Sequence, residues 1–190
     1  LIGLQGRRID TSKLPSFNLV FLLDVSGSMS SANKLPLLKS ALRMLVNEMR
    51  PRDRVAIVVY AGAAGLVLPP TPGNKRERIL EALDNLRAGG STAGGAGIKL
   101  AYKVARQSFA RDGNNRVILA TDGDFNVGQS SDGELVRLME EQRKHGVALT
   151  VLGFGTGNVK DSRMEKLADK GNGNYRSEEH TSELQSLLII

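Results

Sequence analysis

The feature that most constrains this chain is a series of short, almost wholly apolar runs, each followed by a polar or glycine-rich segment. Runs that are apolar on both faces are typical of strands in a parallel sheet that helices cover on both sides. We therefore predict a largely parallel sheet made from the runs at 17–23 (FNLVFLL), 55–60 (VAIVVY), 117–120 (VILA) and 147–152 (VALTVL).

Longer segments between these runs carry apolar residues at helical spacing, which indicates amphipathic helices packed on the sheet. The segment that begins at Leu135 is predicted to end at His145-Gly146, with a basic last turn and a glycine just beyond the helix. The predicted apolar stripes lie at 38–49, 79–86, 98–109, 135–139 and 164–168.

One connection breaks the parallel pattern. Only the small residues AGAAG separate Tyr60 from the short run 66–68 (LVL), whereas a parallel crossover needs a dozen or more residues. We expect a hairpin with an antiparallel edge strand that Pro69 and Pro70 end. The predicted fold class is α/β: a doubly wound, mostly parallel sheet with one antiparallel edge strand and helices on both faces.

With 190 residues, of which 41% are hydrophobic, one domain is the default expectation. Residues 1–16 look like a lead-in from an upstream region, and 17–175 are assigned to the domain. Residues 176–190 (RSEEHTSELQSLLII) change abruptly in character, and we expect a non-native-looking or disordered tail there.

The amino-acid composition excludes several classes of binding partner and site. The net charge of +6 favours anionic partners, but aromatics are only 4% and the basic residues are scattered, so no nucleic-acid partner is expected. The chain has no cysteine, which excludes disulfides and thiolate metal sites. No apolar run approaches the ~20 residues that a transmembrane helix needs, so none is predicted in this chain.

Three groups of polar residues stand where they would meet if this fold is right. Asp24, Ser26 and Ser28 follow the first strand, Asp122 follows the VILA strand, and Thr92 lies in a glycine-rich loop before a helix. Ligands of open α/β sheets bind outside the carboxyl ends of the strands, where the strand order reverses. The three groups therefore converge if the first strand and the VILA strand are neighbours.

The residue types indicate a metal site. Two carboxylates and three hydroxyls form a hard oxygen set suited to Mg²⁺, Mn²⁺ or Ca²⁺, and the sequence does not choose among these ions. Each piece alone has a simpler interpretation, because Thr92 suits a helix N-cap and Asp122 a turn. Their combination predicts a shared site of Asp24, Ser26, Ser28, Thr92 and Asp122.

The stretches FLLDVSGSMS, GGSTAGGAGI and LATDGDFNVG resemble the three metal-site motifs of von Willebrand factor type A (VWA) domains, most closely bacterial ones. This resemblance implies a Rossmann-like fold and a metal-ion-dependent adhesion site. Ser26, Ser28 and Thr92 would then be hydroxyl ligands, while Asp24 and Asp122 would bind the metal directly or through water. It further implies a protein partner whose Asp or Glu completes the metal shell, and a parent protein that is secreted or in the cell envelope.

The resemblance weakens after 173–175 (GNY), where domains of the family continue into a last strand and helix. We therefore expect a C-terminally truncated domain.

Two other functions are alternatives to a binding module. One is a phosphatase or nucleotide hydrolase with Asp24 as nucleophile, although no acidic residue stands two positions later and no lysine follows the glycines. The other is a structural domain with a vestigial site. A non-enzymatic binding module is the preferred interpretation.

Overall fold

The structure, a computed structural model, describes residues 13–61, 63–90, 94–123, 132–154 and 161–177. The side chains at positions 94, 132, 161 and 163 are not described. In chain order the elements are β1 (Phe17–Asp24), the 3-10 turn η2 (Gly27–Ser30), α1 (Leu35–Glu48), β2 (Arg54–Ala61), β3 (Ala63–Pro72), α2 (Arg76–Asp84), α3 (Gly94–Gln107), β4 (Asn114–Thr121), α4 (Asp132–Lys144), β5 (Val147–Gly153), α5 (Asp161–Lys170) and β6 (Tyr175–Ser177).

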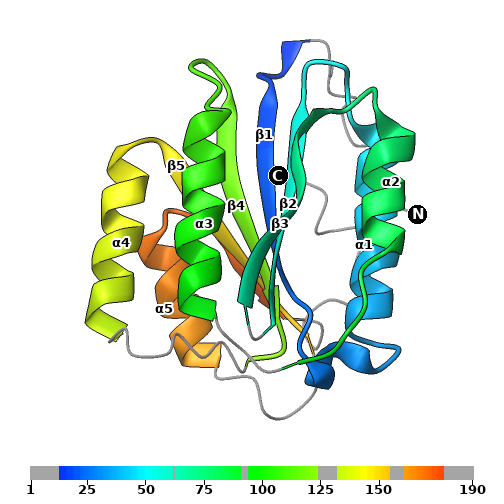
Figure 1. Ribbon diagram of the computed structural model, residues 1–190. Helices are drawn as coiled ribbons and strands as arrows, with labels where there is room; N and C mark the ends of the chain where they lie inside the picture. The colour runs from blue at the N-terminus through cyan, green and yellow to red at the C-terminus, as the bar shows by residue number, and fades with distance from the viewer. Residues whose placement is uncertain (1–12, 62, 91–93, 124–131, 155–160, 178–190) are drawn as a thin grey trace, which may run out of the picture.

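The described strands form one six-stranded sheet in the order β3-β2-β1-β4-β5-β6. All neighbouring pairs are parallel except β2 and β3. This arrangement confirms the predicted fold class, and it makes β1 and β4 the neighbours at which the strand order reverses. The apolar runs are buried on both faces because helices cover both sides of the sheet (Figure 1).

The antiparallel hairpin is confirmed, but the predicted end of its second strand is wrong. β3 continues through Pro69 and Pro70 to Pro72 instead of ending before the prolines. The two prolines lie where the register between β2 and β3 shifts, between the pairs Ile57–Leu68 and Val55–Thr71. A missing N–H is tolerated at such an irregularity of an edge strand, so proline does not end the strand there.

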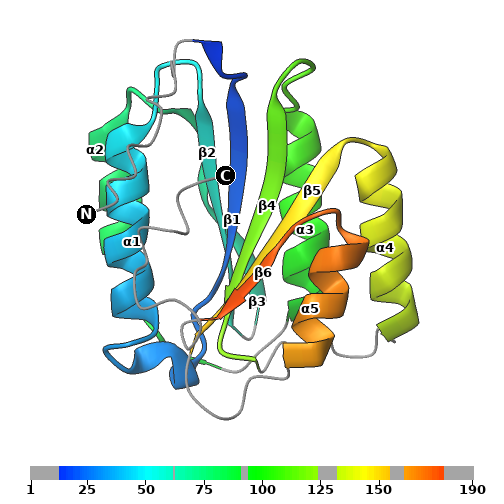
Figure 2. The same cartoon turned by 180° about the vertical axis from the view of Figure 1, so that it is seen from behind.

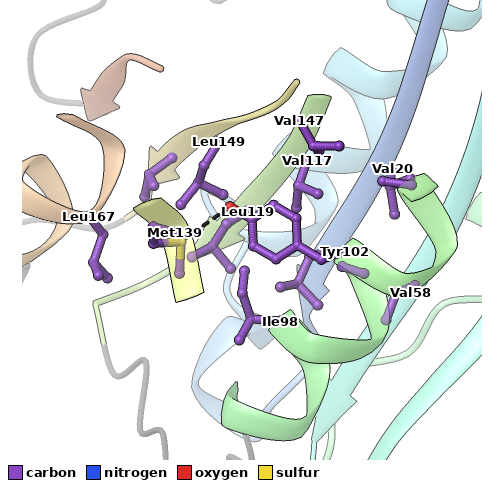
Figure 3. Packing of buried hydrophobic residues seen from close by; sticks show 14 of the residues in the cluster. Val20, Val58, Ile98, Tyr102, Val117, Leu119, Met139, Val147, Leu149 and Leu167 are labelled. Carbon is purple, nitrogen blue, oxygen red and sulfur yellow. Dashed lines mark hydrogen bonds between the residues drawn. The ribbon is translucent and has the colours of Figure 1, made fainter. Parts of the chain in front are cut away.

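The helices form two layers. The cluster on one face joins the sheet to α3, α4 and α5, and the cluster on the other joins it to α1 and α2 (Figures 1 and 2). In the first cluster the Tyr102 hydroxyl donates to the Met139 sulfur at 3.2 Å, so the buried phenol has a polar contact (Figure 3). The stripe that we predicted to include Phe109 ends earlier, because α3 stops at Gln107 and Phe109 is exposed.

A buried amide network joins the amino ends of β1 and β4. Asn18 and Asn115 are register partners, and the Asn18 side-chain amide donates to Asn115 Oδ1 at 2.9 Å. Asn18 also donates to the carbonyl of Ala105 in α3 and accepts from the Ser108 hydroxyl. Polar groups with several partners are tolerated in the core, so this network fixes the ends of three elements.

A second polar cluster holds the chain where it enters β2. Asp53 is buried and accepts hydrogen bonds from the Phe17 amide and from the amide and guanidinium of Arg50. Burial opposes ionisation of Asp53, but these donors outweigh it, and the pKa of Asp53 lies below its ordinary value. The ionised carboxylate thus ties the start of β1 to the turn before β2.

The C-terminal part differs from the sequence interpretation in one detail. Tyr175–Ser177 form the short strand β6, parallel to β5, although no strand was predicted there. The register pairs Val151 with Tyr175, which packs against the first core cluster. The rest of the predicted tail lies outside the described residues. Within the described ranges, no helix combines the length and apolar character required to cross a membrane.

Candidate metal site

The candidate site lies at the carboxyl ends of β1 and β4, at the lower edge of the sheet in Figure 1. Asp24 is the last residue of β1, and Asp122 directly follows β4. Ser26 directly precedes η2, and Ser28 lies within it. The sequence therefore predicted correctly that these strands bring the two carboxylates to one edge.

Asp24 is fully buried, and both of its oxygens accept hydrogen bonds. Oδ1 accepts from the amide of Ser26 at 2.9 Å. Oδ2 accepts from the hydroxyls of Tyr60 and Thr121, each at 3.2 Å. These donors come from β2, β4 and the turn after β1, so three segments fix the orientation of one carboxylate.

Burial and a neighbouring carboxylate both oppose ionisation of Asp24. Burial raises the pKa of Asp24; the hydrogen bonds from Ser26 oppose this, and the negative charge of Asp122 raises the pKa further. Burial and the charge of Asp24 raise the pKa of Tyr60 well above its ordinary value, so this phenol remains a donor. A positive charge between the carboxylates would reduce their repulsion.

The serine hydroxyls lie beside each other. Ser26 Oγ and Ser28 Oγ are 3.0 Å apart, with Ser26 buried and Ser28 exposed. Met29, directly after Ser28, is fully buried in the core beneath α1 and anchors the turn. The alternation in the DxSxS segment thus places Asp24 and the two serines toward one edge while the intervening residues pack or turn.

The glycine-rich loop runs along this turn. The Gly89 amide donates to the Val25 carbonyl at 2.7 Å, and the Gly27 amide donates to the Gly90 carbonyl at 3.3 Å. Gly90 has φ of +87°, a conformation that other residues rarely adopt. Thr92 follows two positions later and lies outside the described residues, so its predicted role as a ligand stays a prediction.

Lys34 is the residue that the sequence interpretation missed. Its Nζ donates to Asp122 Oδ2 at 2.9 Å, across 88 positions of sequence. The side chains are 21% exposed for Lys34 and 4% for Asp122, so the pair is largely shielded from solvent. Lys34 directly precedes α1, and no local pattern links it to Asp122.

Two further supporting residues were not predicted. Tyr60 and Thr121 orient Asp24, and both stand at the carboxyl end of an apolar run, directly after VAIVV and VILA, which is the signal that would have identified them. Among the residues with described side chains, no group of three or more His, Cys, Asp or Glu is placed to hold a metal ion.

Comparison with known proteins gives one consistent family. A profile of the von Willebrand factor type A domain matches residues 18–188. The uncharacterized protein YfbK of Escherichia coli (strain K12) is 46% identical over 178 residues, which are 94% of this chain and 31% of YfbK. The chain thus spans less than a third of the length of that relative.

Solved structures agree on the fold. An aerotolerance-related membrane protein from Bacteroides fragilis has a TM-score of 0.76 at 21% identity, over 91% of this chain and 95% of that one. The manganese-loaded TRAP protein of Plasmodium vivax has a TM-score of 0.68 at 18% identity, over 92% of this chain and 74% of that one. At these identities the similarity concerns the fold alone.

Proposed function

Because this chain belongs to the von Willebrand factor type A domain family, we propose that it is a protein-binding module whose binding depends on a divalent cation. Proteins with this domain are mostly interaction modules rather than enzymes. The observation that carries the proposal is the convergence of Asp24, Ser26, Ser28 and Asp122 at the edge of the sheet where the strand order reverses.

The chemistry of the donor set fits Mg²⁺ or Mn²⁺. Hard cations prefer carboxylate, hydroxyl and water oxygens, and the two carboxylates already repel each other. Ser26, Ser28 and Thr92 would supply hydroxyls, with Asp24 and Asp122 as direct or water-mediated ligands. When bound, the cation would supply a localised positive charge that a partner's Asp or Glu carboxylate can approach. The manganese bound by the TRAP protein is consistent with this choice of ion.

The burial of Asp24 favours binding over hydrolysis. A nucleophilic carboxylate needs an oxygen that can reach the substrate, but both oxygens of Asp24 accept hydrogen bonds and the residue is fully buried. The donors Tyr60 and Thr121 would hold this carboxylate in place as a support for the serine turn. The alternative of a phosphatase or nucleotide hydrolase that uses Asp24 is therefore disfavoured.

We also propose that the parent protein is located in the cell envelope. This domain would be the partner-binding part of that protein, and the occurrence of the same fold in a membrane protein of Bacteroides fragilis is compatible with such a location. An Asp or Glu of a protein ligand would approach the cation from solvent. The exposed turn 30–33 beside Ser28 would add contacts specific to that ligand.

Two measurements test the proposal. Calorimetric titration with Mg²⁺ and Mn²⁺ should give binding that is lost in Asp24→Ala and weakened in Ser26→Ala/Ser28→Ala. Ser31→Ala is the matched control, because it removes a nearby exposed hydroxyl and should bind the ion as the parent chain does. Unchanged binding in Asp24→Ala would rule out this metal site.

The second measurement concerns the partner. A pull-down from an envelope extract in Mg²⁺ should retain partners that are lost in EDTA and in Ser26→Ala/Ser28→Ala, but kept by Lys103→Gln, which changes an exposed side chain of α3 away from the site. Recovery of the same partners under all these conditions would contradict the cation-dependent mechanism even if the ion binds.

A further inference from the structure

A groove beside the candidate metal site has no role in the function proposed above. It has a volume of about 440 Å³, and its lining comes from the first turns of α1 and the segment that follows α2. Its apolar floor is formed by the buried Leu35 and Leu86. The complete lining is Ser30, Leu35, Pro36, Lys39, Ser40, Arg43, Leu86, Arg87 and Ala88.

The charged lining of the groove is entirely cationic. Lys39, Arg43 and Arg87 border it, and none of its lining residues is acidic. The nearest described counter-charge is Asp84, which pairs with the Arg43 guanidinium at the end of α2. Three cations therefore face one carboxylate, and an anion in the groove would find an excess of positive charge.

Two of these cations, Lys39 and Arg87, are held in place by backbone carbonyls. Lys39 Nζ donates to the carbonyls of Asp84 and Leu86, at 2.9 and 3.3 Å, and Arg87 donates to the same two carbonyls. Burial lowers the pKa of Lys39, and the charge of Arg87 lowers it further. The cations are thus close enough to repel each other, and an anionic ligand would relieve that repulsion.

The groove adjoins the candidate metal site. Ser30 lines the groove and stands two positions after Ser28, whose hydroxyl contacts Ser26 Oγ. The segment 86–88 on the other side leads directly into Gly89 and Gly90, which pair with the turn at 25–27. The turn after β1 and the segment after α2 thus contribute residues both to the groove and to the edge that carries the candidate site.

We propose that this groove binds an acidic peptide segment of a protein partner, adjacent to the partner carboxylate that approaches the cation. The proposal rests on the proposed function for the orientation of the partner. A peptide suits the groove better than a free phosphate, because the floor is apolar and two carbonyl oxygens face Lys39. Acidic side chains would contact the guanidinium groups while the aliphatic parts of the peptide cover Leu35 and Leu86.

The test uses a fluorescein-labelled hexaglutamate peptide and fluorescence anisotropy, with EDTA present throughout to remove any contribution of the metal. Arg43→Gln/Arg87→Gln should weaken peptide binding by about tenfold, as expected for two charge-assisted contacts that are partly exposed. The matched control is Lys99→Gln/Lys103→Gln on α3, which removes the same charge from the opposite face of the sheet and should change binding less than about twofold.

A second variant guards against a folding defect. Ser40→Glu places a carboxylate in the groove at an exposed helical position and removes only the hydrogen bond to the Pro36 carbonyl. It should weaken hexaglutamate binding while thermal unfolding stays that of the parent chain. Titration of Mg²⁺ into Arg43→Gln/Arg87→Gln should match the parent chain, so failure of the groove and failure of the metal site give different results.

Three outcomes would overturn the proposal. The first is the absence of hexaglutamate binding in EDTA at low salt, and the second is an equal loss in the α3 control. The third is that millimolar inorganic phosphate displaces the peptide and proves to bind more tightly than the peptide does. The groove would then be a phosphate site. Weakening confined to the groove variants, and reduced by added salt, supports it.

Discussion

The ion pair between Lys34 and Asp122 leads to a prediction about metal affinity. In the absence of a metal, the Lys34 ammonium is the cation that neutralises Asp122, at 2.9 Å. A divalent ion that takes Asp122 as a ligand has to displace this ammonium and then remains near it. Lys34→Met removes the competing charge but keeps a side chain of similar length, so this variant should bind Mg²⁺ and Mn²⁺ more tightly.

The size of the effect follows from the burial of the pair. Exposed ion pairs contribute about 0.2–1 kcal/mol, whereas removing one partner of a fully buried pair costs about 3–5 kcal/mol. With Lys34 21% exposed and Asp122 4% exposed, an intermediate value of about 1–2 kcal/mol is expected. Because the metal-bound state has no such pair to lose, the dissociation constant should fall by about 5- to 30-fold.

Two assays on the same protein check this reasoning. Calorimetric titration gives the affinity, and thermal unfolding in EDTA should show that Lys34→Met is less stable than the parent chain, because Asp122 has lost its buried counter-charge. Saturating Mg²⁺ should remove that difference. Lys103→Met, on the exposed side of α3, is the control with the same change of charge. Unchanged or weaker metal binding in Lys34→Met would refute the displacement argument.

Three further predictions concern stability and catalysis. The folded-state pKa of Asp53 is depressed, so the stability that its carboxylate contributes is present at neutral pH and is lost as the pH falls below 3.8 through the folded-state value. Urea unfolding at pH 7 should show that Asp53→Asn is less stable than the parent chain by about 2–3 kcal/mol. The variant should also lack the loss of stability that the carboxylate causes at acid pH. A Cβ at Gly97 would lie 3.1 Å from Leu22 Cδ1 and Tyr60 Cβ. The overpacking should cost about 1–3 kcal/mol and the better helix propensity of alanine should return about 0.5–1 kcal/mol, so Gly97→Ala should be less stable by about 0.5–2 kcal/mol in the same assay; equal or higher stability would show that the core adjusts. The domain with Mg²⁺ should release no phosphate from nucleotides or phosphate esters above buffer in a colorimetric assay, and turnover abolished by Asp24→Asn would support the enzyme alternative.

The sequence predicts this fold well because its strands are buried on both faces. Runs such as 17–23 and 147–152 have few polar residues, so their local pattern and their tertiary environment agree. The antiparallel edge strand is also predictable from the sequence, because the short AGAAG connection allows only a hairpin. The end of that strand was not predictable, because β3 tolerates Pro69 and Pro70 only through a register shift with β2, and no local sequence pattern indicates that shift.

In the candidate site, too, some features follow from the local sequence pattern and others depend on tertiary contacts. The placement of Asp24, Ser26, Ser28 and Asp122 at one edge of the sheet was predictable because they follow strand ends, whose position in space follows from the topology. Their role as metal ligands stays a prediction. The pairing of Lys34 with Asp122 was not, since it depends on the path of a turn and on a side chain reaching across the sheet edge. The groove beyond it involves α1 and the segment after α2, which are distant in sequence and meet only through packing.

The asparagine pair at the amino ends of β1 and β4 has a consequence for the opposite edge of the sheet. Strands that are apolar on both faces can slide by two residues and still bury similar side chains, so their hydrophobic pattern alone does not fix the alignment. Such a slide would move Asp24 about 6–7 Å relative to Asp122 and separate the carboxylates. Because Asn18 and Asn115 lose their hydrogen bond in any alignment but the native one, this pair excludes the slid arrangements. Asn18 lies about 20 Å along β1 from Asp24, so the ability to hold an ion at one end of the domain depends on an amide at the other.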